Sequence, residues 1–375
     1  MNVKNFTTLF SLIFALSAAA QPSLKQNLNT PRAGDDIIKQ QVEYKDPGRS
    51  GENVLWDFGQ LQSINDEYDL LYSTPNDTII TGTEHLTQYH YVLQNDSLLL
   101  WGFDNQTTQL WNIQPEFILK FPFHYGDSIG SYYYAHGKYS NRLEMDVMGT
   151  TCTTADAYGM MVLPNRDTLK QVMRTHTLKY IAENMVPITD SYYKKLESPL
   201  IISPDSINLR LATDSVVFVE EIFRWYEEGY RYPIFETVRS WTQQKGNEDY
   251  TFLNTAFFYP PQEHYYLATD PENEAIVYSK NANKKNNVLE NTSFNAFPNP
   301  MTSIVNVEIF IPMEAKIKIQ LRSVSNHNVY INENKGKFAA GLYTFPFSVS
   351  QLPMGYYLLN LWADNYMFSA MLLKK

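Results

Sequence analysis

The motif Gly126-Asp127-Ser128-Ile129-Gly130 is the part of the sequence whose residue types and spacing most directly suggest chemistry. A serine spaced in this way between two glycines is typical of a nucleophile elbow, in which a sharp strand-to-helix turn presents the hydroxyl to a histidine base. Residues 117–123 are typical of the preceding strand, but residues 131–134 predict a second strand where the elbow needs a helix. Ser128 is therefore only a weak candidate for a catalytic nucleophile.

The tripeptide around Ser128 belongs to a series. Asp, then Ser or Thr, then an aliphatic residue recurs along the chain, with the hydroxyl residue at Thr78, Ser97, Ser128, Thr168, Ser206 and Ser215. An Asp side chain that closes a turn, followed by a hydroxyl residue and an apolar position, is what a turn-to-strand junction requires. Gly126-Asp127-Ser128 also resembles the start of a lipase and esterase family, but the Asp-x-x-His pair of that family is missing from the sequence.

The seven histidines do not have the spacing of a metal site. His85 and His90 are five residues apart, which does not match the His-Glu-x-x-His pattern of a zinc-binding helix. The acidic run at residues 270–274 lacks the regular alternation and the glycine of a calcium loop. We therefore expect neither a metal nor another cofactor.

The composition excludes one class of partner and favours one class of fold. The 375 residues include 30 Lys and Arg against 40 Asp and Glu, a formal net charge of −10, which argues against nucleic-acid binding because that requires a basic face. Aromatic residues make up 14% and charged residues 19%, a balance typical of a β-rich extracellular protein. The aromatic runs at 132–134 and 257–259 favour roles in the core and on sheet faces over a stacking platform for sugars.

Short alternating runs dominate the chain from Asp36 to Tyr278. Val54, Trp56 and Phe58 alternate with Leu55 and Asp57, and turn residues separate this run from the next. The pattern predicts an all-β, sandwich-type region of one or two domains, because a sandwich is the commonest arrangement of many short strands. For helices, the sequence indicates only short turns near 179–184 and 191–197.

The N-terminus has the features of an export signal. Lys4 precedes an apolar run at residues 9–15, and Ala18-Ala19-Ala20 is a small-residue cleavage site before Gln21. The apolar run is shorter than the roughly 20 residues that span a bilayer, so we expect cleavage between Ala20 and Gln21 and no transmembrane segment in the mature chain. The single cysteine, Cys152, predicts a fold without internal disulfides, with this residue in a strand.

The chain is expected to divide at one polar segment. Residues 279–291 lack aromatic residues and apolar periodicity, which is typical of a linker. We predict a signal peptide at 1–20, a β-rich region at 21–278 with a further division near 155–158 if it holds two domains, the linker, and a C-terminal domain at 292–375.

The C-terminal segment begins with Phe297-Pro298-Asn299-Pro300 and contains the turn Leu352-Pro353-Met354-Gly355-Tyr356-Tyr357 before its penultimate predicted strand. The chain ends in a strand followed by Lys374-Lys375. These features, in this order, resemble the type A C-terminal sorting domain of the type IX secretion system of Gram-negative bacteria. Residues 322–328 depart from that family because they lack its usual mid-domain glycine.

The resemblance implies a small immunoglobulin-like sandwich whose sorting motif comprises Pro298, Asn299, Pro300, Leu352, Pro353, Gly355, Tyr357, Lys374 and Lys375. It implies the secretion machinery as a partner, transport across the outer membrane, and release or attachment at the cell surface. Thr78, Ser97, Ser128, Thr168, Ser206 and Ser215 also resemble the O-glycosylation acceptors of bacteria with this system, which agrees with a place in exposed turns.

Two functions of different classes are consistent with these residues. The first is a non-enzymatic binding or structural protein of the cell surface or medium, with a glycan or protein ligand. The second is a secreted hydrolase acting on glycans or esters, with Ser128 as its nucleophile. Flat aromatic sheet faces would favour the first, and a cleft with converging carboxylates or a Ser-His pair would favour the second.

Overall fold

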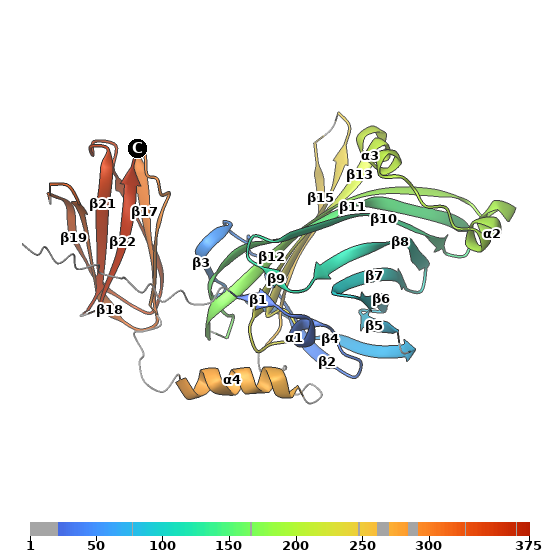
Figure 1. The fold of residues 1–375 in the computed structure, drawn as a ribbon, viewed down its shortest axis with the longest axis horizontal. Coiled ribbons are helices and arrows are strands. Elements are labelled where there is room, and N and C mark those ends of the chain that lie inside the picture. The colour runs from blue at the N-terminus through green and yellow to red at the C-terminus, as the bar shows by residue number, and fades with distance from the viewer. Residues whose placement is uncertain are drawn as a thin grey trace, which may run out of the picture.

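The computed structural model describes residues 22–76, 78–165, 167–246, 248–260, 270–283, 292–326, 328–364 and 366–375. The described chain is mostly β, which confirms the all-β part of the predicted fold class. It forms a large N-terminal unit and a smaller C-terminal sandwich, which lie next to each other (Figure 1). The predicted signal peptide and cleavage site lie outside the described residues.

One sheet that closes on itself forms the N-terminal unit. Its strands are β2 (Asp36–Val42), β4 (Ser63–Asn76), β5 (Ile79–Glu84), β6 (Thr87–Gln94), β7 (Ser97–Asp104), β8 (Thr108–Lys120), β10 (Ser128–Tyr139), β11 (Leu143–Val162), β12 (Thr168–Pro187), β13 (Val216–Glu227), β14 (Phe235–Gln244) and β15 (Tyr250–Phe258). Neighbours follow the order β10-β8-β7-β6-β5-β4-β2-β15-β14-β13-β12-β11, and pairing of β10 with β11 closes the ring. A further strand, β3 (Gly51–Asp57), pairs in parallel with β11 at the outside of the ring.

The closed sheet differs from the sandwich that the alternating pattern predicted for this region. Alternation shows that each strand buries one face, but the same pattern arises whether the sheet covers that face with a second sheet or by curling round. Two strands of 20 residues each, β11 and β12, run the length of the unit, and most of the other strands follow one another as antiparallel neighbours. Ala155 to Tyr158, the predicted division, lie within β11.

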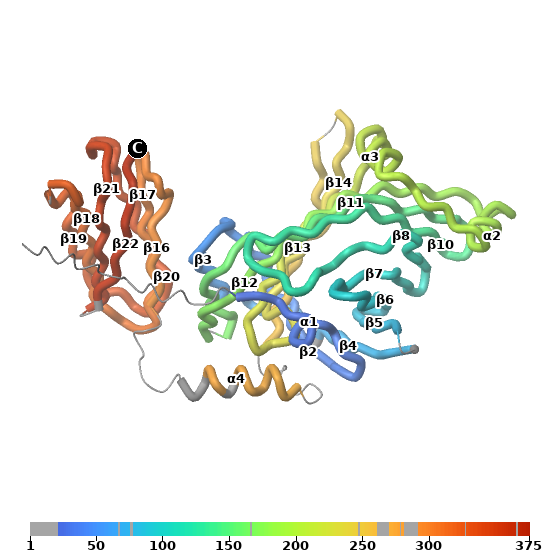
Figure 2. The backbone as a smooth tube through the Cα atoms, in the orientation of Figure 1, coloured from blue at the N-terminus to red at the C-terminus, as the bar shows by residue number. Residues whose placement is uncertain are grey.

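One end of the ring is covered by segments from both ends of the unit. They are β1 (Ser23–Leu24), which pairs with β9 (Phe123–His124), the short helix α1 (Gln26–Asn29), and α4 (Pro271–Asn283). Arg231 ties them together, because its guanidinium donates to both carboxylate oxygens of Asp270 and to the carbonyl oxygens of Asn27 and Thr30. Figure 2 shows the N-terminal segment in dark blue above the orange helix α4.

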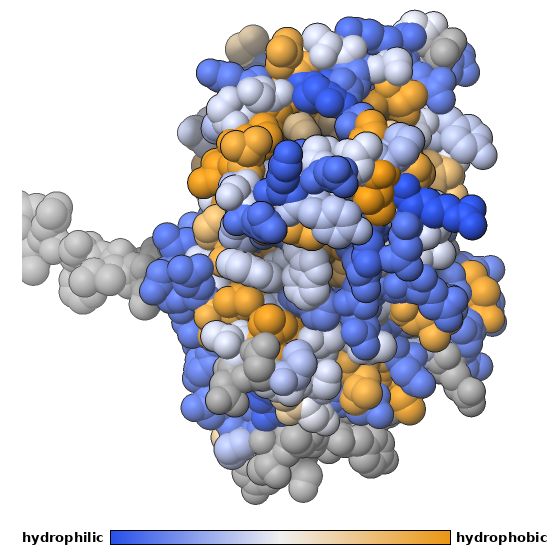
Figure 3. Space-filling model, turned by 90° about the vertical axis from the view of Figure 1, so that its right-hand side faces the viewer, coloured by the Kyte–Doolittle hydropathy of each residue, from blue (hydrophilic) through white to orange (hydrophobic). Residues whose placement is uncertain are grey.

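Two further helices connect β12 to β13 at the far end of the unit. α2 (Asp190–Glu197) and α3 (Pro204–Thr213) each begin after a residue whose side chain accepts a hydrogen bond from the first turn, Thr189 and Ser203 respectively. The predicted turn at 191–197 is thus part of α2, whereas residues 179–184 belong to strand β12. Figure 3 views this side of the molecule, where orange hydrophobic groups are scattered among hydrophilic ones.

The C-terminal unit is a sandwich of two sheets. Its strands are β16 (Ser293–Phe297), β17 (Ile304–Ile311), β18 (Ala315–Ser323), β19 (Val329–Phe338), β20 (Gly341–Ser348), β21 (Gly355–Ala363) and β22 (Tyr366–Lys374). The sheets have the orders β16-β17-β20 and β19-β18-β21-β22. Alternate residues of both sheets, such as Val307, Ile319 and Leu361, meet in a core with no exposed surface. A sandwich is what the sequence predicted here.

The two units are in contact along a small surface. Leu55 of β3, together with Met160 and Val162 of β11, packs against Phe310 of β17. The guanidinium of Arg49 lies 4.7 Å from the centre of the Phe297 ring. The segment that connects the units includes the end of α4 at Asn283, within the range 279–291 expected to be a linker, and residues 284–291 lie outside the described chain.

Candidate functional site

The closed sheet surrounds a cavity of about 550 Å³. Because successive side chains of a strand point to opposite faces, alternate residues of most of the strands line it, for example Glu220, Ile222, Arg224 and Tyr226 of β13. Its size lies within the range of roughly 300 to 1,000 Å³ that is usual for small-molecule sites. The cavity is therefore the first candidate for a functional site.

Ion pairs bring charge into this interior. Glu220 of β13 lies directly opposite Lys179 of β12 in the ladder, and the Lys179 ammonium is 3.5 Å from Glu220 and 3.1 Å from Glu116 of β8. Arg224 lies opposite Glu236 of β14, and its Nε donates to that carboxylate. Every strand that supplies one of these groups contributes to the wall of the cavity.

A third cation lies deeper in the wall. Lys39 of β2 is almost fully buried, and its ammonium is 2.7 Å from a carboxylate oxygen of Glu84 and 4.2 Å from the centre of the Phe257 ring. It also donates to the hydroxyl of Tyr259 at 3.2 Å. These contacts satisfy the Lys39 ammonium, so Lys39 stabilises the wall of the cavity and is not a free binding group.

Burial and pairing shift the acid–base behaviour of these groups. Burial raises the pKa of Glu116 above its ordinary value, although Lys179 opposes the shift. Burial lowers the pKa of Arg224, but the charge of Glu236 more than offsets this. Burial raises the pKa of Glu236, but the charges of Arg224 and Lys39 hold it below its ordinary value. The pair Arg224–Glu236 is therefore fully ionised at neutral pH.

Tyrosines form much of the remaining wall. Tyr68, Tyr72, Tyr89, Tyr91, Tyr226, Tyr232 and Tyr259 all line the cavity. Burial raises the pKa of Tyr68 and of Tyr226 to about 12, and it raises those of Tyr72 and Tyr91 further. At neutral pH these phenols are uncharged and can donate a hydrogen bond as well as accept one.

The cavity reaches the surface on one side of the ring. Asn65, His85 and Leu253 line it and are exposed. This mouth lies beside the junction of β2 with β15, where only Gln40, Gln41 and Val42 pair with residues 256–258 within the described chain. The earlier residues of β15 continue past β2, and the side chain of Gln41 donates to Thr255 at 3.0 Å. The opposite end is covered by Asn29, Pro31 and Arg231.

Ser128 is not placed as the nucleophile-elbow hypothesis requires. It is the first residue of β10, it is exposed, and its hydroxyl lies 3.1 Å from the Thr154 hydroxyl and 3.4 Å from the Cys152 sulfur. A strand follows it instead of a helix, and the nearby His124 pairs with Asp127 at 3.2 Å rather than with Ser128. Cys152 lies in strand β11, as expected, and is exposed.

The other residues of the Asp-Ser/Thr series lie mostly at strand starts. Ser97 and Thr168 begin β7 and β12, while Thr78 and Ser215 immediately precede β5 and β13. Ser206 differs, because it lies in the first turn of α3. Thr78, Ser128, Ser206 and Ser215 are exposed and Thr168 is half-buried, as acceptors for glycosylation need, whereas Ser97 is buried.

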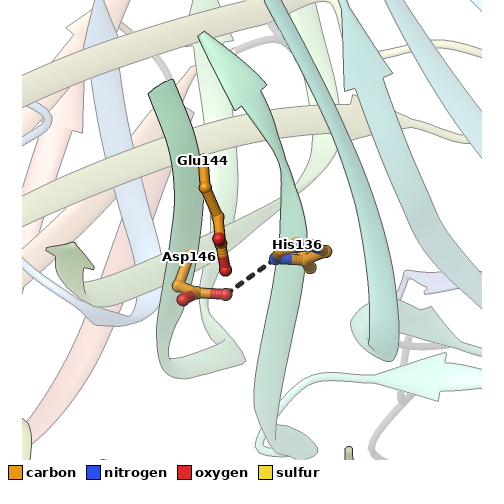
Figure 4. Close-up of side chains that lie close together, drawn as sticks. All are labelled: His136, Glu144 and Asp146. Atoms are coloured by element: carbon orange, nitrogen blue, oxygen red, sulfur yellow. Dashed lines mark hydrogen bonds and ion pairs between the residues drawn. The ribbon is translucent and has the colours of Figure 1, made fainter. Parts of the chain in front are cut away.

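The structure also assembles a polar cluster that sequence reasoning missed. His136 of β10 and Asp146 of β11 are direct partners in the ladder, and Glu144 precedes Asp146 by two residues in β11. His136 Nδ1 is 2.8 Å from Asp146, and Figure 4 shows the two side chains pointing toward each other. The ligand atoms of all three residues lie within 4.8 Å of one another. Only the hairpin register, which the turn at Ser140 and Asn141 sets, could have revealed this cluster.

A lysine already supplies the positive charge that this cluster needs. Lys195 of α2 donates to Glu144 and, at 2.9 Å, to Asp146. Tyr134 donates to Asp146 at 2.6 Å. Burial raises the pKa of Asp146, but the hydrogen bonds from His136, Tyr134 and Lys195 hold it well below its ordinary value. The cluster therefore anchors α2 to the closed sheet.

The predicted sorting residues lie close together in the C-terminal sandwich. The Asn299 side chain donates to the carbonyl oxygen of Met371 and accepts from the backbone N–H of Leu373, which fastens the segment Pro298 to Pro300 to the last strand. The Tyr357 hydroxyl donates to the carbonyl oxygen of Pro353 at 2.7 Å. That bond fixes the turn, which also contains Leu352.

The end of the chain closes this arrangement. Lys374 pairs with Gly355 in the ladder and forms a parallel bridge with Met301, whose backbone also receives a hydrogen bond from the N–H of Lys375. The first and last segments of the sandwich are thereby joined.

Comparison with known proteins identifies only the C-terminal unit. No curated protein and no solved structure matches the chain significantly. In the described part of the chain, no helix has both the length and the apolar character that a membrane crossing would need. Residues 295–375 match the family described as the secretion system C-terminal sorting domain. The C-terminal unit of this protein is therefore a sorting domain of the type IX secretion system, which implies export followed by secretion or attachment to the cell surface.

Proposed function

We propose that the protein is an exported, non-enzymatic binding protein that holds a small ligand inside its closed sheet. The observation that carries this proposal is the cavity of about 550 Å³, which combines ion pairs, uncharged phenols and apolar side chains around one enclosed volume. An interior with no ligand to hold is normally filled by side chains, because voids forfeit packing energy. The alternative of a secreted hydrolase has less support, since Ser128 contacts Thr154 and Cys152 and lies outside the cavity.

The proposal includes the route and the processing of the chain. Cleavage between Ala20 and Gln21 would release the signal peptide, residues 21–278 would carry the ligand, and residues 292–375 would engage the secretion machinery through the linker at 279–291. Glycosylation at the exposed residues of the Asp-Ser/Thr series would occur away from the cavity, because none of these residues lines it.

Cavity filling tests the binding function. Ile222 lies on the inner face of β13 between Glu220 and Arg224, so Ile222→Trp places an indole ring inside the cavity. Gln243→Trp adds the same ring to the exposed face of β14 and is the matched control. Native mass spectrometry and solvent extraction of the exported protein should reveal a small molecule in the wild type and in Gln243→Trp.

The same measurement can also contradict the proposed binding function. Ile222→Trp should lose the bound molecule while it keeps a cooperative melting transition. Equal recovery of the molecule from both variants, or no molecule in any of the three proteins, would remove the basis for the binding function.

A further inference from the structure

The guanidinium of Arg224 is the polar group of the cavity with the most unused hydrogen-bonding capacity. Its Nε donates to Glu236, but within the described residues neither terminal nitrogen has a hydrogen-bond partner. The side chain keeps 28% of its surface accessible, and because Arg224 lines the cavity, that surface faces the enclosed space. An arginine has five N–H donors in one plane, so a fork of donors points into the cavity without an acceptor.

Two phenol groups extend this donor surface. Tyr91 and Tyr226 both line the cavity, and both are close enough to Arg224 to interact with its charge. Neither hydroxyl has a hydrogen-bond partner among the residues that the structure describes. Because burial keeps both phenols protonated, each hydroxyl has a proton to donate.

The carboxylates of the cavity do not offer a comparable site for a cation. Glu116 and Glu220 share the ammonium of Lys179, and Glu84 is paired with Lys39. Glu236 is bound by Arg224 and lies 4.0 Å from Lys39, so Lys39 adds a second positive charge next to the pair Arg224–Glu236. Among the described residues, the hydrogen-bonding groups of the cavity that are still available are therefore donors. They require an acceptor from the ligand, and they lie near the two cations Arg224 and Lys39.

We propose that the cavity binds a small organic carboxylate with an apolar body. This inference rests on the proposed binding function and specifies its ligand. The two carboxylate oxygens accept from the terminal nitrogens of Arg224, the pairing for which a guanidinium fork is best suited. The hydroxyls of Tyr91 and Tyr226 donate to the same group. The apolar body lies against Leu100, Ile118 and Val238, which also line the cavity.

Acid and amide pairs of the same shape provide the test. The probes are naphthalene-2-carboxylate, 3-phenylpropanoate and octanoate, each compared with its primary amide by ligand-observed NMR and calorimetry on the exported full chain after solvent extraction. A primary amide keeps the size of the acid but replaces one acceptor oxygen with a donor and removes the charge. We expect the acids to bind about ten- to a hundredfold more tightly than their amides, as the loss of charge-assisted hydrogen bonds requires.

A pair of arginines on opposite faces of the sheet supplies matched variants. Arg224 and Glu236 face the cavity, while Arg239 and Glu221 are also direct cross-strand partners of β13 and β14, on the outer face. Arg224→Lys keeps the positive charge beside Glu236 but loses the planar fork, so the fold should survive. We expect Arg224→Lys to reduce the preference for the acids at least tenfold, because the bidentate fork is lost although the charge remains, and Arg239→Lys to leave it intact.

The outcomes of these experiments test the ligand class separately from the binding function. Amides that bind as well as acids, or a preference for acids that is undiminished in Arg224→Lys, would overturn the carboxylate assignment, and binding of neutral hydroxylated compounds would then replace it. The absence of binding by all the probes would also overturn it. The proposed function fails separately, through the comparison of Ile222→Trp with Gln243→Trp.

Discussion

Lys179 of β12 and Glu116 of β8 form an ion pair at 3.1 Å although their strands are not neighbours in the sheet. Strands β10 and β11 separate them along the ring, so the pair crosses the interior instead of following the ladder. Lys39 of β2 and Glu84 of β5 are related in the same way across β4. These contacts connect wall segments that no backbone hydrogen bond joins directly.

The first prediction is that Lys179→Met destabilises the closed sheet by about 2–4 kcal/mol. The Glu116 side chain is only 3% exposed, and removal of its partner would leave a carboxylate without compensation in the interior. Urea denaturation followed by tryptophan fluorescence measures the change. The double variant Lys179→Met/Glu116→Leu should recover most of the loss, and an unchanged Lys179→Met protein would show that the pair contributes nothing.

The second prediction concerns acid stability and Asp146. Its pKa is depressed in the folded state, so its stabilising contribution is complete above its unfolded value of about 4 and disappears as the pH falls further, through the folded value. Asp146→Asn should therefore be less stable than the wild type at neutral pH, and the difference should shrink toward pH 2. Melting temperatures across this range measure it, and a constant difference would contradict the assignment.

The third prediction is that Ser128→Ala leaves ligand binding and every measurable activity unchanged. The hydroxyl belongs to a turn-to-strand junction, so its loss should reduce stability by no more than about 0.5–1.5 kcal/mol. Ser97→Ala and Ser215→Ala serve as controls from the same series. Esterase or peptidase turnover that disappears only in Ser128→Ala would restore the hydrolase alternative, because removal of a serine nucleophile reduces the rate by orders of magnitude.

The fourth prediction is that a chain without residues 294–375 folds but is not secreted. The sandwich has its own core, separate from the cores of the closed sheet, so the N-terminal unit loses only the small contact surface that includes Phe310, Phe297 and the hydrogen bond from Asn295 to the Asn53 carbonyl oxygen. Cell fractionation should find the truncated protein in the periplasm with its cooperative melting transition intact. Its appearance in the medium at the normal level would contradict a sorting role.

The fold was predictable to the level of strands but not to the level of their closure. In the C-terminal unit, the motifs at both ends resemble a family that forms a sandwich, and the alternating residues of β18 agree with a strand that buries one face. In the N-terminal unit, Val54, Trp56 and Phe58 alternate in the same way, yet Val54 and Trp56 lie in the separate strand β3 at the outside of a ring, and Phe58 directly follows that strand. Whether a sheet curls depends on register across many strands, which a local pattern does not encode.

The candidate site was harder to predict than the fold. Glu220, Arg224 and Tyr226 alternate along β13 as residues of a solvent-facing sheet surface would, so nothing in this local pattern places them inside. Once the ring closes, the same face becomes an interior wall. The aromatic run at 257–259 was predicted to lie in the core or on a sheet face, and Phe257 and Tyr259 are buried beside Lys39.

The short junction of β2 with β15 gives the ring one weak link. Three paired positions, from Gln40 to Val42, hold these strands together, fewer than between any other neighbours in the described ring. A structure of this kind opens locally where the fewest bonds must break, and amide hydrogen exchange reports such openings residue by residue. Fast exchange at Ala256 and Phe257 beside slow exchange in β11 and β12 would mark a gate at the mouth of the cavity, whose opening rate limits how quickly a guest molecule leaves.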